Sequence, residues 1–189
     1  VVARTALNCG ASLVNDVSGL RYDPALAGEV VARRAGLILS HTRGRSSDMY
    51  SQASYKAATE EIVSELEWSL KAASDAGITR EHVIVDPGLG FAKRAEHSMT
   101  VLSQLERLRS LDRPILVGPS RKSFLTAVIG NVPPAEREWG TAGAVAASVL
   151  LGAHVVRVHG VRAMVDVVRV ADAIRMHREG LSVTTTDQG

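Results

Sequence analysis

The residues of this sequence that could perform chemistry stand directly after short apolar runs. Asp86 follows the apolar run 82–85, and a proline and two glycines then prevent a strand from continuing. The other runs end in Asn15 and Asp16, in His41, in Ser120, Arg121 and Lys122, and in Arg157 and His159. A parallel sheet brings the carboxyl ends of its strands to one edge, so we expect these side chains to share one site.

Their chemistry suits a ligand that combines a flat polar edge with an anionic tail. A carboxylate such as Asp86 can accept two hydrogen bonds from an amidine-like edge. The amide of Asn15 can donate and accept beside it, and Lys122 supplies a point charge to a ring carbonyl. Arg157 and His159 suit a phosphate or a diphosphate. We therefore predict a site for a polar ring that carries an anionic group.

Structural roles compete with these functional ones. Asp16 and Ser120 are also explained as caps of a turn and of a helix, and His41 is better explained as a loop histidine with satisfied hydrogen bonds. The sequence contains no nucleophile elbow, no P-loop and no pair of metal ligands at helical spacing. Cys9 is the single cysteine, which excludes an intramolecular disulfide. We expect it to be a buried thiol.

The composition is that of one globular domain in which helices cover a buried parallel sheet. The 189 residues are 46% hydrophobic, 22% charged and only 4% aromatic, with a net charge of +2. The basic residues are scattered, so we expect no nucleic-acid partner. The longest apolar run, 140–156, is shorter than the roughly 20 residues that a membrane span needs. We therefore expect no membrane partner and a cytoplasmic location.

Apolar periodicity and turn residues predict five strands that alternate with helices. We place the strands at 12–14, 37–40, 82–85, 114–117 and 154–158. We place the helices at 1–8, 24–35, 55–76, 96–111, 123–129, 138–151 and 161–177. This alternation implies an α/β fold with a parallel sheet and right-handed crossovers.

Two parallel architectures compete for this pattern. A flavodoxin-like open sheet needs about five strands, and few of them feed its site. A TIM (β/α)8 barrel draws its site from the ends of many strands. Since all five strands end in candidate site residues, we favour a barrel of which this chain holds only about the last five βα units. We expect residues 1–179 to form this partial barrel, residues 180–189 to be a disordered tail, and the natural chain to begin upstream of Val1.

Four motifs resemble those of dihydropteroate synthase, in order and at plausible spacing. They are NDVSG at 15–19, DPGLGFAK at 86–93, GPSRKSF at 118–124 and RVH at 157–159. The resemblance implies a TIM-barrel transferase of folate biosynthesis. It would join 6-hydroxymethyl-7,8-dihydropterin diphosphate to 4-aminobenzoate and release pyrophosphate. Both small-molecule substrates are then partners of the site, and the family's usual assembly is a homodimer.

The same resemblance implies roles for individual residues. The pterin-binding set, which includes the catalytic pair Asp86 and Lys122, is Asn15, Asp86 and Lys122. The set on the aminobenzoate side is Phe91, Arg121 and Ser123. The diphosphate-binding pair is Arg157 and His159. These assignments agree with the division into flat-edge groups and anion-binding groups made from the residue types.

The sequence also departs from the family pattern. The family's opening strands carry a metal-binding asparagine and a further pterin carboxylate, and neither is in this chain. We therefore expect Mg²⁺ to be held by a part that precedes Val1, with no metal ligand in these residues. Gly160 stands where the family has Asp, and residues 41–44 match the family's His-Met-x-Gly only loosely. We expect residues 1–189 alone to self-associate, with exposed sheet edges, and to lack synthase activity.

Two other functions are compatible with the same motifs. A methyltetrahydrofolate-dependent methyltransferase on the same barrel could share the contacts of Asn15 and Asp86 to a pterin. The stretch 120–122 and the pair Arg157 and His159 fit the synthase better. A synthase paralogue that binds pterin without turnover is the second alternative, and Gly160 is the feature that favours it.

Overall fold

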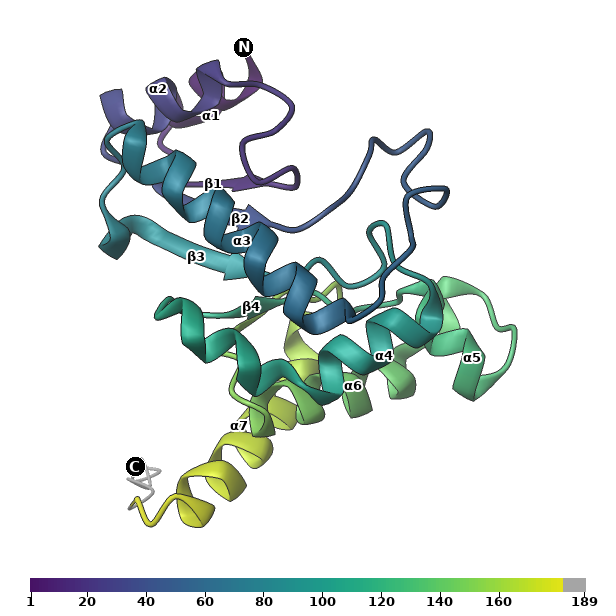
Figure 1. Cartoon of the computed structure of the whole chain (residues 1–189). Coiled ribbons are helices and arrows are strands. Elements are labelled where there is room, and N and C mark those ends of the chain that lie inside the picture. The colour runs from purple at the N-terminus through teal and green to yellow at the C-terminus, as the bar shows by residue number, and fades with distance from the viewer. Residues whose placement is uncertain (182–189) are drawn as a thin grey trace.

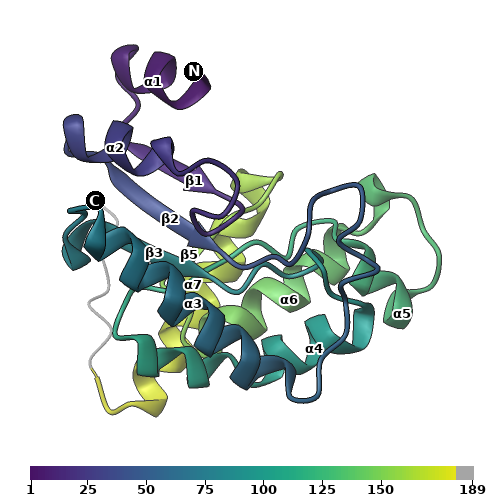
Figure 2. The ribbon, with the colours of Figure 1, turned by 45° about the horizontal axis from the view of Figure 1, so that its top comes forward.

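Helices alternate with five short parallel strands in the computed structural model, which describes residues 1–181 (Figures 1 and 2). The strands are β1 (Leu13–Asp16), β2 (Gly36–Ser40), β3 (Val83–Asp86), β4 (Leu116–Val117) and β5 (Val155–Val156). The predicted parallel α/β fold is confirmed. The last strand is shorter than the predicted 154–158.

The strands lie side by side in the order of the chain. β1, β2 and β3 form one parallel ladder, and β4 and β5 form another. A parallel bridge between Val85 and Ile115 connects the two. A flavodoxin-like sheet reverses its order at a switch point, whereas the order of these five strands does not reverse. The register of the ladder pairs Ser40, the last residue of β2, with Asp86, the last residue of β3, so these two strands end at the same level.

The helices cover the outer face of the strands (Figure 1). The α-helices are α1 (Val2–Asn8), α2 (Ala25–Ala32), α3 (Ala58–Asp75), α4 (Ala95–Ser103), α5 (Thr126–Ile129), α6 (Glu138–Leu150) and α7 (Val161–Arg178). The 3₁₀ segments are η1 (Arg80–His82), η2 (Leu105–Leu111), η3 (Ser123–Leu125) and η4 (Pro134–Glu136).

The single helix predicted for 96–111 was wrong, because it is two elements. α4 ends at Ser103 and the 3₁₀ segment η2 follows. The leucines at 102, 105, 108 and 111 are spaced by three, which is the period of a 3₁₀ helix and puts all of them on one face. All four are buried. The spacing of three suits the 3₁₀ geometry of η2, in which Leu105, Leu108 and Leu111 share the buried face.

The core lies between the strands and the helices in two clusters. One joins α3 to β3 and β4 through Ile62, Leu66, Val85 and Ile115. The other packs α1 and α2 on β1 and β2. In α3, Ile62 and Leu66 are fully buried, so this face of the helix packs on the core.

The prediction that Cys9 is a buried thiol was wrong, and most of the predicted tail lies outside the described residues. The thiol of Cys9 is exposed, because this residue caps the end of α1 beyond the buried Leu7. Of the predicted tail 180–189, residues 182–189 fall outside the described residues. Within residues 1–181 no helix has both the length and the apolar character to cross a membrane.

Candidate functional site

A cavity of about 330 Å³ opens at the carboxyl ends of the strands. Its lining comes from β1 and from the segments that follow β1, β3, β4 and β5. The lining residues are Asn15, Val17, Phe91, Gly118, Ser120, Lys122, Arg157, Val158 and His159. Five predicted site residues are among them: Asn15, Phe91, Lys122, Arg157 and His159. The structure therefore brings these five residues together at one cavity, whereas the strand-end residues Asp16, His41 and Arg121 do not line it.

Asp86 lies beneath this cavity and is only 1% exposed. Its Oδ1 accepts a hydrogen bond from the backbone N–H of Gly88 at 2.7 Å. Its Oδ2 accepts one from Nη2 of Arg157 at 3.1 Å. The same guanidinium donates from Nη1 to Oδ1 of Asn15 at 2.7 Å. Arg157 thus binds both predicted ring-edge residues and presents to Asp86 the kind of planar donor edge that a carboxylate recognises.

Two glycines let the backbone approach closely around Asp86. A Cβ on Gly88 would lie 2.0 Å from the carbonyl oxygen of His41, and the φ of Gly88 is +66°. A Cβ on Gly118 would lie 2.7 Å from Nη2 of Arg157. Gly88 excludes a side chain through both its backbone conformation and this contact, whereas a Cβ on Gly118 would require the guanidinium of Arg157 to move.

Lys122 and Phe91 form one wall of the cavity. The Nζ of Lys122 lies 3.8 Å from the centroid of the Phe91 ring, within the range of a cation–π interaction. Burial lowers the pKa of Lys122, and Arg157 acts in the same direction, while Asp86 opposes the shift. The cavity therefore combines a partly desolvated ammonium with an aromatic face.

Ser120 holds His159 in place and does not act as the helix cap considered from the sequence. The Oγ of Ser120 accepts the backbone N–H of His159 at 3.2 Å, and it lies 2.9 Å from Nδ1 of the same residue. The Oγ of Ser120 can donate to Nδ1 or accept from it, depending on the ring tautomer, and either bond holds the ring of His159 against the buried Ser120.

Arg121 and Ser123 are not among the residues that line the cavity. Arg121 has its backbone N–H bonded to Oγ1 of Thr141 and its Nε 3.4 Å from Oε2 of Glu138. Ser123 is exposed at the start of η3. Their assignment to the aminobenzoate side remains a prediction.

Two structural readings of the sequence are confirmed. The carboxylate of Asp16 accepts bonds from the backbone N–H groups of Ser18 and Leu20, so it caps the turn after β1. His41 is 2% exposed, with both ring nitrogens in hydrogen-bond contact. Its partners, Lys93 and Glu65, had no predicted role.

Glu138 occupies the space beside Gly160. A Cβ on Gly160 would lie 2.4 Å from Oε1 of Glu138. Gly160 is also the N-cap of α7 and offers no side chain to cap it. A carboxylate from α6 therefore lies where the family's Asp would begin, and it also pairs with Arg121. The sequence could not reveal this contact, because Glu138 begins α6 and Gly160 precedes α7.

We expect positions 138 and 160 to be energetically coupled. In the Gly160→Asp variant the new carboxylate meets Glu138 and displaces it, whereas in Glu138→Ala/Gly160→Asp it can cap α7 freely. The substitution at 160 should be more favourable by about 1 kcal/mol in the Glu138→Ala background. Denaturant unfolding of the wild type, both single variants and the double variant measures this difference, and additive effects would contradict the contact.

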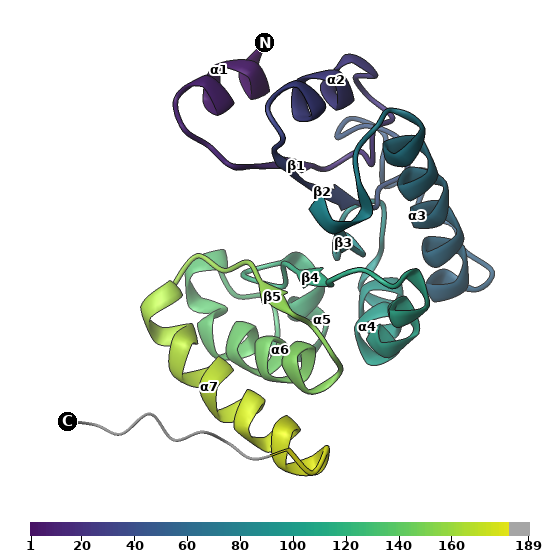
Figure 3. The ribbon, with the colours of Figure 1, turned by 90° about the vertical axis from the view of Figure 1, so that its left-hand side faces the viewer.

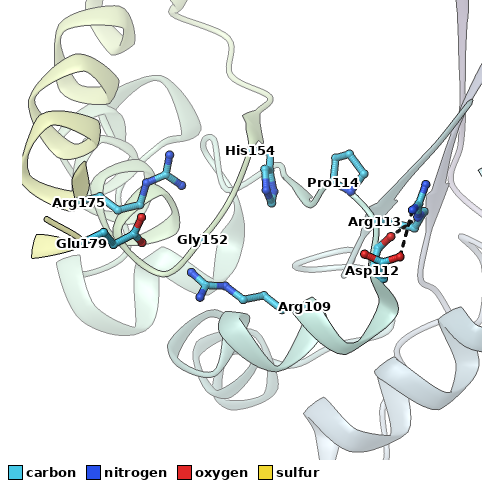
Figure 4. Close-up of a pocket in the computed structure, with 8 residues that line it drawn as sticks. All are labelled: Arg109, Asp112, Arg113, Pro114, Gly152, His154, Arg175 and Glu179. Carbon is cyan, nitrogen blue, oxygen red and sulfur yellow. Dashed lines mark hydrogen bonds and ion pairs between the residues drawn. The ribbon is translucent and has the colours of Figure 1, made fainter. Parts of the chain in front are cut away.

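A larger cavity, of about 760 Å³, lies at the other end of the strands (Figure 4). Pro114 and His154, which line it, precede β4 and β5. Two of its arginines already pair with acids, Arg113 with Asp112 and Arg175 with Asp172. None of the predicted site residues reaches it. The strand-end cavity is therefore the candidate site.

A magnesium site is not formed by the described residues. No group of three or more His, Cys, Asp or Glu within residues 1–181 could hold a metal ion. The predicted Mg²⁺ therefore has no set of ligands in this part of the chain.

Comparison with known proteins identifies the family. Residues 1–159 match the pterin binding enzyme family. The chain belongs to that family. The predicted resemblance is therefore confirmed at the level of the family.

Several relatives of this chain are dihydropteroate synthases. The Synechocystis enzyme is 40% identical over 173 residues, which are 92% of this chain and 60% of that protein. The Thermus thermophilus enzyme, solved in complex with 4-aminobenzoate, superposes with a TM-score of 0.86 at 34% identity, covering 92% of this chain and 66% of that one. The Xanthomonas albilineans enzyme in complex with 7,8-dihydropteroate gives 0.84 at 32% identity, covering 92% and 63%. The chain thus spans about three-fifths of the length of these pterin-binding enzymes.

Proposed function

We propose that the protein containing this chain is a dihydropteroate synthase of folate biosynthesis. The observation that carries the proposal is the convergence of Asp86, Asn15, Lys122, Arg157 and His159 at one cavity. These are the groups that a polar ring with a diphosphate tail requires. Family membership and the ligands of the related structures support the same reading.

The geometry indicates how the pterin substrate would be held. Asp86 would accept hydrogen bonds from the edge of the pterin ring, and Asn15 would accept and donate beside it. The guanidinium of Arg157 now occupies this position. A bound ring takes the place of that guanidinium, which is then free for the diphosphate beside His159. The ammonium of Lys122 lies over the Phe91 ring. The 4-aminobenzoate approaches on the Phe91 side.

The proposed reaction depends on charge more than on a nucleophilic side chain. The C–O bond to the diphosphate breaks, and its electron pair leaves with the diphosphate oxygen. The reduced pterin stabilises the resulting methylene cation, with Asp86 favouring the positive charge on the ring. The amine nitrogen of 4-aminobenzoate forms the new C–N bond and loses a proton. Arg157, His159 and Lys122 neutralise the departing anion.

The fold proposal is that residues 1–179 are a partial TIM barrel. The elements form an open arc, with β1 and α1 at one end and β5 and α7 at the other (Figure 3). Apolar side chains stay exposed at both ends, with Leu13 at 44%, Val155 at 39% and Val165 at 37%. Further βα units of a barrel would cover these edges. Mg²⁺ binding and a homodimer are proposals for the longer protein that rest on the resemblance to the family. A cytoplasmic location is a proposal that rests on the sequence.

An assay of the intact protein tests the function. With dihydropterin diphosphate and 4-aminobenzoate, we expect dihydropteroate and pyrophosphate in equal amounts. Pterin binding in calorimetry without either product would favour the non-catalytic paralogue. Methyl transfer from methyltetrahydrofolate would favour the methyltransferase. Residues 1–189 alone should self-associate and give no product, and an active monomeric preparation would contradict the partial barrel.

A further inference from the structure

A chain of three polar side chains, of which two are buried, lies next to the candidate site. Lys93 lies in the loop between β3 and α4, His41 follows β2, and Glu65 belongs to α3. The Nζ of Lys93 is 2.8 Å from Nδ1 of His41. The Nε2 of the same ring is 3.1 Å from Oε2 of Glu65. Lys93 and His41 are each 2% exposed.

The direction of these hydrogen bonds follows from the donors. A lysine ammonium has only donors, so Nδ1 of His41 must accept from Lys93. The ring proton is then on Nε2, which donates to the carboxylate of Glu65. Burial lowers the pKa of His41 to about 4, and Lys93 acts in the same direction, so the ring is neutral as this arrangement requires.

Three acceptors surround the ammonium of Lys93. Besides Nδ1 of His41, these are the carbonyl oxygens of Phe91 at 3.0 Å and of His41 at 3.4 Å. An ammonium group has three N–H donors, so its charged form satisfies each acceptor once. The lysine thereby connects the backbone at Phe91 to the end of β2. The same carbonyl of His41 packs against Gly88.

Charged groups from every neighbouring element act on this lysine. Burial lowers the pKa of Lys93 to about 7. Asp86 of β3 and Glu65 of α3 oppose the shift, whereas Arg43 after β2 and Lys122 after β4 reinforce it. Because Lys93 belongs to the loop that carries Phe91, loss of its proton removes a donor within that loop near neutral pH.

We propose that Lys93, oriented by His41 and Glu65, is a positioning residue for the acceptor-amine side of the site. It acts through the carbonyl of Phe91, whose ring faces Lys122. This inference rests on the proposed function, because the amine side is defined by that reaction. The protonated lysine holds Phe91 in place, and the neutral lysine releases one of its bonds.

The decisive variant is Lys93→Met, with Lys71→Met as its matched control. Lys71 lies on α3 with its side chain 73% exposed and pairs only with Asp75 among the described residues. In the intact protein, Lys93→Met should raise the KM for 4-aminobenzoate about tenfold, which corresponds to the loss of one charged hydrogen bond. The dissociation constant of the pterin substrate should change less than about threefold. Lys71→Met should leave both constants unchanged.

The pH dependence separates positioning from a merely structural role. In the wild type, the KM for 4-aminobenzoate should rise as the pH increases through about 7. This rise should vanish in Lys93→Met. In Glu65→Gln, which removes a charge that supports the ammonium, its midpoint should move to lower pH. Glu65→Gln also provides a test if Lys93→Met fails to fold.

Folding stability gives a readout that needs no activity. The pKa of Lys93 in the folded protein is below its unfolded value of about 10.5. The native state then binds fewer protons between these values, so the free energy of unfolding rises with pH across this range. The wild type should show this rise relative to Lys93→Met between pH 7 and 9. The same pH slope in both proteins would overturn the inference.

The assay of the intact wild-type protein distinguishes the two proposals. If the wild type forms no dihydropteroate, the proposed function is wrong, and the stability measurement alone decides on Lys93. If the wild type forms dihydropteroate while Lys93→Met keeps the KM and pH profile of the wild type, the function stands and the positioning role of Lys93 is wrong.

Discussion

Asp86→Asn is expected to lower kcat/KM of the intact protein by about 10² to 10⁴-fold. Asparagine keeps the shape of the side chain and can still accept the N–H of Gly88. It removes the negative charge that faces Arg157 and that would favour positive charge on the pterin ring. Steady-state kinetics and calorimetry with the pterin substrate measure the effect.

Asp16→Asn is the matched control for this substitution. Asp16 is also a buried carboxylate at a strand end, but its oxygens accept bonds from its own turn. Its variant should lower the melting temperature and leave kcat/KM within about tenfold of the wild type. If Asp86→Asn behaved like Asp16→Asn, losing stability without losing turnover, the carboxylate would be a turn cap and the site assignment would be wrong.

Lys122→Met is expected to lower kcat/KM by about 10² to 10³-fold. Methionine keeps an unbranched apolar stem against Phe91, so the wall of the cavity persists. The ammonium 3.8 Å from the ring centroid is lost, and with it a charge that would neutralise the departing diphosphate. Single-turnover kinetics separates this loss from weaker pterin binding. A decrease in kcat/KM that arises only from pterin affinity would restrict Lys122 to binding.

The strand-end residues could be predicted because their signals are local. Asp86 follows a short apolar run and precedes a proline and two glycines, so its place at the end of a strand is encoded within ten residues. The same reasoning found Asn15, Lys122, Arg157 and His159, and all four line the cavity. Residue types alone predicted a flat polar ring with an anion, and the resemblance to the family led to the substrates that we propose.

Contacts between distant elements could not be predicted in this way. Arg157 and Asn15 are bonded across 142 positions, and Lys93 and His41 across 52. No pattern within one helix or strand specifies such a pair, because it depends on how crossovers and register place the elements. The same holds for Glu138 beside Gly160, whose contact depends on the packing of α6 against the start of α7.

The sequence by itself determined the parallel α/β class, the strand ends and the chemical types gathered there. These follow from period, turn residues and side-chain chemistry, which act over short distances. Tertiary structure alone decided that Arg157 pairs with Asp86 and Asn15, and that Lys93 is buried against His41. A side chain becomes buried and gains a charged neighbour only when separate strands meet. The tertiary structure therefore decides the pKa values and the hydrogen bonds of the site.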